Sequence, residues 1–118
     1  MSKSEEPIVV IKWLHSSSGR SKRSEIVNQG CFVLEHEATG RFYLGQSDNV
    51  SKDVDKQLSQ LANGKHPNKI LNVLYEKDNE IRVFEYPQKA KKKRVTLMRE
   101  LIEKAGYLCL NPRDVRNV

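Results

Sequence analysis

The sequence has few residues that could cross-link the chain or anchor it in a membrane: two of its 118 residues are cysteines. Cys31 and Cys109 lie beside apolar residues, and no Cys/His spacing fits a zinc site, so we predict reduced core thiols. The longest apolar run, Ile8–Ile11, is far shorter than the roughly 20 residues of a membrane span. Residues 1–6 are polar and contain no signal-peptide core. We therefore expect a cytoplasmic protein that has no membrane partner.

Positive charge, in contrast, is in excess. The chain has 21 Lys and Arg against 15 Asp and Glu, a net charge of +6 and a pI near 9.4. Such a surplus favours a polyanionic partner such as DNA or RNA, although many small basic proteins bind neither. The candidate nucleic-acid contacts are Lys89, Lys91, Lys92, Lys93 and Arg94, with Arg20, Lys22 and Arg23 in a polar N-terminal segment. Cations at the start of a helix oppose its dipole, which suggests a use in binding phosphates, but a solvated surface is the simpler alternative.

The order of predicted elements indicates a small α/β (α+β) domain. The predicted strands cover residues 7–14, 30–36, 41–45 and 81–86, and the predicted helices cover residues 50–62, 67–76 and 92–105. We expect a three-stranded antiparallel sheet flanked by three helices, extended by the strand at 7–14. The predicted division is an N-terminal extension (1–28, with a basic loop at 15–24), one domain (29–112) and a C-terminal tail (113–118).

Local signals set the limits of the predicted helices. Ser47–Asn49 offers N-cap side chains for the first helix, and Asn63-Gly64 predicts its end. Pro67 is expected at the first position of the second helix. That helix should turn Ile70, Leu71 and Leu74 inward. Trp13 is expected to pack within the first strand, with an exposed partner contact as its alternative.

Two triplets in the predicted hairpin carry a family resemblance. Gly30-Cys31-Phe32 and, after ten residues, Tyr43-Leu44-Gly45 resemble the signature of the GIY-YIG nucleases. Residues 46–50 and 60–71 also resemble the family's turn and helices, especially those of phage-type and homing-endonuclease members. The resemblance covers about residues 29–112. It implies a metal-dependent nuclease fold, a nucleic-acid partner for which DNA is favoured over RNA, and an origin in the cytoplasm of a bacterium or a phage-infected cell.

By this resemblance, the sequence keeps the expected residue type at some of the family's functional positions. Tyr43 stands in the second triplet, His66 precedes the second helix, and Asn111 corresponds to the family's closing asparagine. Glu100 corresponds best to the metal-binding carboxylate, so the resemblance implies Mg²⁺ held through Glu100. Tyr43, His66 and Glu100 are thus the candidate catalytic residues. Each also has a structural alternative, which is strand packing for Tyr43, helix capping for His66 and pairing with Lys104 for Glu100.

Three other family positions are altered. Phe32 replaces a tyrosine, Asp53 replaces the arginine of the first helix, and Gln57 stands where a histidine is common. A carboxylate in place of a phosphate-binding cation would repel the substrate, and Lys56, three residues on, is a better replacement cation than Lys52, which points about 100° away around the helix. We therefore predict a degenerate site in a nucleic-acid-binding protein with weak or absent cleavage. The alternatives are an active Mg²⁺-dependent DNA endonuclease and a phage-type module that binds a host or viral protein.

Overall fold

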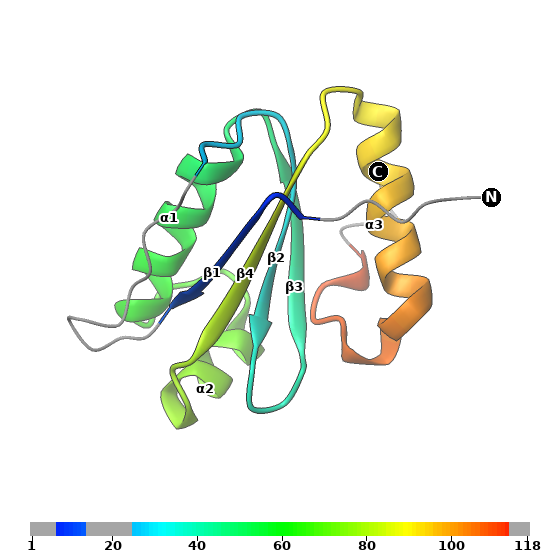
Figure 1. Cartoon of the computed structure of the whole chain (residues 1–118). Helices are drawn as coiled ribbons and strands as arrows, with labels where there is room; N and C mark the ends of the chain where they lie inside the picture. The colour runs from blue at the N-terminus through cyan, green and yellow to red at the C-terminus, as the bar shows by residue number, and fades with distance from the viewer. Residues whose placement is uncertain (1–6, 14–24, 114–118) are drawn as a thin grey trace.

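A computed structural model describes residues 7–13 and 25–113 of the chain (Figure 1). The strands are β1 (Val9–Trp13), β2 (Gly30–His36), β3 (Phe42–Ser47) and β4 (Ile81–Pro87). The helices are α1 (Val50–Ala62), α2 (Lys69–Lys77) and α3 (Lys91–Ala105), followed by a short 3-10 turn at Gly106–Leu108. These bounds agree closely with the predicted elements, and the predicted α/β (α+β) class is confirmed.

The four strands form one antiparallel sheet in the order β1-β4-β2-β3. The hairpin pairs Phe32 with Gly45 and Leu34 with Tyr43, so the two triplets lie side by side as predicted. β1 pairs with β4 from Val9↔Glu85 to Trp13↔Ile81. The sheet therefore has four strands, which are the three strands of the predicted sheet and the N-terminal strand predicted at 7–14.

Helices cover both faces of the sheet. In Figure 1, α1 and α2 lie on one face and α3 lies on the other. Alternate residues of β2 therefore enter two separate cores, Phe32 and Leu34 toward α1 and Cys31 and Val33 toward α3. Burial raises the pKa of the Cys31 thiol to about 12, so this cysteine is an inert thiol, and neither cysteine forms a disulfide.

The start of α1 differs from its predicted capping. Within the described part of the chain, the N-cap residue Asn49 makes no side-chain cap. Instead, the backbone carbonyls of Asn28 and Val27 accept hydrogen bonds from the N–H groups of Val50 (2.6 Å) and Ser51 (2.9 Å). The segment before β2 thus satisfies the free donors of the first helical turn.

The start of α2 also differs, because Pro67 lies two residues before the helix. Asn68 is the N-cap, and its side chain accepts a hydrogen bond from the backbone N–H of Leu71 at 3.0 Å. The helix buries Leu71 and Tyr75, whereas Ile70 is 49% exposed, so the prediction that Ile70 points inward was wrong. Trp13 packs against this core and donates a hydrogen bond from Nε1 to the Tyr75 hydroxyl at 2.9 Å.

Within residues 7–13 and 25–113, no helix has the length and apolar character that a membrane span requires.

Candidate functional site

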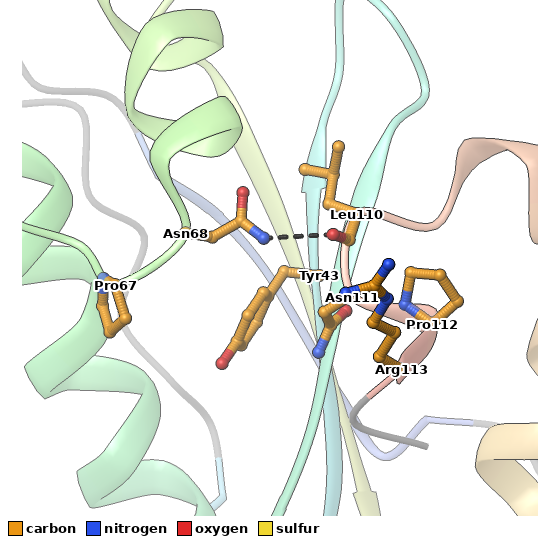
Figure 2. Close-up of a pocket in the computed structure, with 7 residues that line it drawn as sticks. All are labelled: Tyr43, Pro67, Asn68, Leu110, Asn111, Pro112 and Arg113. Carbon is orange, nitrogen blue, oxygen red and sulfur yellow. Dashed lines mark hydrogen bonds between the residues drawn. The ribbon is translucent and has the colours of Figure 1, made fainter. Parts of the chain in front are cut away.

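A pocket of about 460 Å³ lies beside the edge strand β3. Figure 2 shows Tyr43 of β3 between the segment that leads into α2 and the C-terminal segment. The residues that line the pocket are Tyr43, Pro67, Asn68, Leu110, Asn111, Pro112 and Arg113. Of the residues predicted to be catalytic, Tyr43 lines this pocket, His66 lies beside it, and Glu100 is not among its lining residues.

The C-terminal wall of the pocket is held against β3 by hydrogen bonds. Asn111 is buried, and its carboxamide donates to the Leu44 carbonyl at 2.6 Å and accepts from the Leu44 N–H at 2.9 Å. The Leu110 N–H also donates to the Phe42 carbonyl at 2.7 Å. Because these groups belong to the edge strand, the C-terminal segment satisfies backbone groups that would otherwise lack a strand partner.

Asn68 connects the two walls of the pocket. Its side-chain nitrogen donates to the Leu110 carbonyl at 3.1 Å, which is the dashed line in Figure 2. Its side-chain oxygen simultaneously caps α2. One side chain therefore fixes the start of α2 relative to the C-terminal segment.

The His66 ring packs against the Tyr43 ring. The two rings meet edge to face, with centroids 4.9 Å apart and an interplanar angle of 88°. The Asn68 backbone N–H donates to Nδ1 of His66 at 3.0 Å, so Nδ1 carries no proton. Nε2 is then the protonated nitrogen, and it donates to the Gln57 side-chain oxygen at 2.8 Å. Both ring nitrogens are thus occupied by protein partners.

Burial makes His66 a poor base. Its side chain is 3% exposed, and desolvation of the charged form lowers its pKa to about 4. The imidazole is therefore neutral at pH 7. The residue's backbone is also held, because its N–H donates to the Asn72 side-chain oxygen at 3.1 Å and its carbonyl accepts from the Asn72 amide at 2.7 Å. Asn68, and not His66, caps α2, and His66 instead organises the turn between α1 and α2.

The Phe32 ring lies on Gly45 of the neighbouring strand. A Cβ placed on Gly45 would come within 2.2 Å of the ring tip, so this position requires glycine for space rather than for backbone conformation. Phe32 is 1% exposed and belongs to the apolar core on the α1 side. Its ring supplies packing where the resemblance would place a hydroxyl.

Asp53 and Gln57 lie one turn apart on α1, and both are half-buried. Neither residue lines the pocket. Gln57 has a defined role, because its side-chain oxygen accepts a hydrogen bond from the Nε2–H of His66. A carboxamide in this position suits a neutral imidazole, since its oxygen accepts a hydrogen bond but carries no charge that would favour protonation of the ring.

Glu100 lies half-buried on α3, on the other side of the sheet from α1. Across the described ranges, no three His, Cys, Asp or Glu side chains come together as metal ligands. The described residues that line the pocket likewise include no carboxylate. The donor set around Tyr43 therefore does not fit a divalent cation, and Mg²⁺ through Glu100 stays a prediction from the resemblance.

The basic residues predicted between 89 and 94 differ in their exposure. Lys89, Lys91, Lys92 and Lys93 are exposed where β4 leads into α3, and Lys56 is exposed on α1. Arg94, in contrast, is 2% exposed. Its guanidinium pairs with Asp48 at 3.1 Å and donates to the carbonyls of Gln88 (2.8 Å) and Lys89 (3.1 Å).

Arg94 therefore does not belong to the group of exposed basic side chains, because its guanidinium is buried and already paired. The reason is positional. The residue faces the sheet from the first turn of α3, where it joins two loops by a network of charge-assisted hydrogen bonds. The other predicted basic contacts, Arg20, Lys22 and Arg23, lie outside the described residues.

Sequence reasoning missed two residues of the pocket, Asn68 and Arg113. Asn68 follows Pro67 and precedes an apolar helix, so its capping role was readable from local sequence. Arg113 follows Asn111 by two residues, but only the packing of the C-terminal segment against β3 brings it to Tyr43. It was assigned to a tail that begins at residue 113.

No protein-family model matches the chain, and no curated protein matches its sequence. Among solved structures, the fold is similar to a variant of the catalytic domain of the intron endonuclease I-TevI, with a TM-score of 0.54 and 17% identity. The likeness covers 68% of this chain and 86% of that chain. The chain therefore has the fold of a GIY-YIG nuclease catalytic domain, as the two triplets predicted.

Proposed function

We propose that this protein binds nucleic acid on a GIY-YIG nuclease scaffold and has weak or absent cleavage activity. DNA is the proposed partner, as for the endonuclease whose fold it shares, and the cytoplasm of a bacterium or a phage-infected cell is the proposed location. The main support for weak or absent cleavage is that the His66 ring is neutral and has both nitrogens in hydrogen bonds. A histidine that is neutral, buried and bonded at both nitrogens does not accept a proton from an attacking water.

The altered positions support the same conclusion. Phe32 has no hydroxyl with which to take part in proton transfer, and Asp53 brings a negative charge where the resemblance places a phosphate-binding arginine. Loss of a single transition-state donor lowers a rate by about 10²–10³, and several losses together leave little activity. The carboxylate Glu100 also lies outside the pocket around Tyr43.

Binding is supported by the charge that remains. Lys89, Lys91, Lys92 and Lys93 form an exposed surface at the start of α3, which we call the basic surface. These lysines are close together in the sequence, just before α3 and in its first turn. No salt bridge among the described residues involves them. Such a group is available to neutralise phosphates along a nucleic-acid backbone.

A salt titration of DNA binding tests the basic surface. The triple variant K91A/K92A/K93A should lower the slope of log K against log salt on duplex DNA by roughly two to three, because each phosphate contact contributes about 0.9. The matched control K65A/K77A/K104A removes the same charge from other exposed positions and should change the slope much less. Equal effects of the two variants would show that net charge rather than this surface binds DNA.

A nicking assay tests the catalytic part of the proposal. Supercoiled plasmid incubated with the wild-type protein and Mg²⁺ or Mn²⁺ should be nicked no faster than with E100A. Nicking at an ordinary enzyme rate that E100A abolishes would establish the alternative, an active metal-dependent endonuclease. Absence of both nicking and DNA binding would instead favour the protein-binding module.

A further inference from the structure

The pocket contains a cation that does not come from the first helix. Arg113 lines the same pocket as Tyr43, while Asp53 is not among the lining residues. The Arg113 side chain is exposed, and no carboxylate among the described residues forms a salt bridge with it. Its guanidinium therefore presents free donors to a pocket that solvent enters.

The segment that carries Arg113 is held in place. Leu110 and Asn111 bind the backbone of β3 through three hydrogen bonds, and Asn68 holds the Leu110 carbonyl from the opposite wall. Pro112 then restricts the backbone between this clamp and Arg113. Because the attachment is fixed before any ligand arrives, less conformational entropy is lost when the arginine binds one.

The charge of the pocket indicates which ligand it would take. Arg113 is the one charged side chain among its described lining residues, which otherwise contribute amides, prolines, a leucine and the Tyr43 phenol. Phosphate oxygens match the planar fork of a guanidinium. The lining thus suits an anion and offers no carboxylate for a metal ion.

We propose that Arg113 binds a phosphodiester of the nucleic-acid backbone in the pocket beside Tyr43, as the replacement for the arginine that Asp53 displaced. This inference rests on the proposed nucleic-acid binding and adds to it a second contact, separate from the basic surface. The bound strand is then held at two places, at the start of α3 and in the pocket at the edge of β3. Arg113 is a binding residue in this proposal and transfers no proton.

Two measurements on the full chain test the proposal. In salt titrations with a short DNA duplex, R113A should lower the slope by about one, R113K should retain it, and R41A should leave it unchanged. Arg41 is the control because it is exposed at the turn between β2 and β3 and does not line the pocket. In nuclear magnetic resonance spectra of arginine side chains, the Nε–H signal that R113A removes should shift when the duplex is added.

The outcomes separate this inference from the proposed function. If the protein binds the duplex but neither the R113A slope nor the Arg113 signal changes, the inference fails and the proposed function stands. If the wild type binds no duplex at low salt, both fail. A response of the Arg113 signal to inorganic phosphate but not to the duplex would identify a pocket for small phosphates and would overturn the backbone contact.

Discussion

The neutral state of His66 predicts a specific loss of stability in acid. Burial lowers the pKa of His66 from 6.5 to about 4, so the unfolded chain takes up this proton before the folded protein does. The free energy of unfolding is therefore unaffected above about pH 7 and falls as the pH drops from 6.5 toward 4. Each pH unit in this window costs about 1.4 kcal/mol, so the loss by pH 5 is about 2 kcal/mol.

The assay compares urea unfolding of the wild type and H66Q at pH 7 and pH 5, followed by circular dichroism. H66Q has a lower free energy of unfolding than the wild type at both pH values. Its decrease from pH 7 to pH 5, however, should be smaller than that of the wild type by about 2 kcal/mol, because the other groups titrate equally in both proteins. The informative second variant is Q57E. A carboxylate in place of the Gln57 oxygen favours the protonated ring, so it should raise the pKa of His66 and reduce the acid loss.

Identical pH dependence of the wild type and H66Q would refute this reasoning. The imidazole would then titrate in the folded protein as it does in the unfolded chain. It would be free to accept a proton near neutral pH, and the main argument against a catalytic His66 would be lost.

Three further predictions concern the hairpin, the C-terminal clamp and the altered site. G45A should destabilise the protein by about 1–3 kcal/mol in urea unfolding, because its methyl group meets the Phe32 ring, and F32L should restore part of this loss. N111A should cost about 2–4 kcal/mol in the same assay, since it leaves a buried N–H and C=O of β3 without their partner. The double variant D53R/F32Y should leave plasmid nicking at the wild-type level, because His66 is neutral and Glu100 lies outside the pocket. Nicking that rises in the double variant and is lost again when E100A is added would show that the parts of the site do assemble.

The protein's architecture was largely determined by local sequence. The apolar stripe of α1, from Val50 to Leu61, falls on one helical face, and Gly64 with φ 70° follows the helix end. The alternation in β2 indicated a strand packed on both faces, and the Ala38–Gly40 turn indicated the hairpin that brings the two triplets together. These features were readable because helix and strand periods and turn residues act over a few neighbouring positions.

Tertiary structure decided which polar side chains of the candidate site are buried, which are paired and which line the pocket. Arg94 was indistinguishable by sequence from the lysines before it, but packing places it against the sheet, where Asp48 and two carbonyls neutralise it. His66 was retained as a catalytic candidate, but its turn buries the ring between Tyr43, Gln57 and Asn68. Arg113 was placed in a tail, although it lines the pocket.

The physical reason is the same in all three cases. Sequence patterns specify which side of a helix or strand is apolar, because that property is periodic along the chain. The burial, charge state and hydrogen-bond partners of a polar side chain depend instead on groups that are distant in sequence, such as Asp48 for Arg94 or Gln57 for His66. The sequence therefore determined the scaffold and the residues available to it, and only the folded structure decided which of them remain free to bind or react.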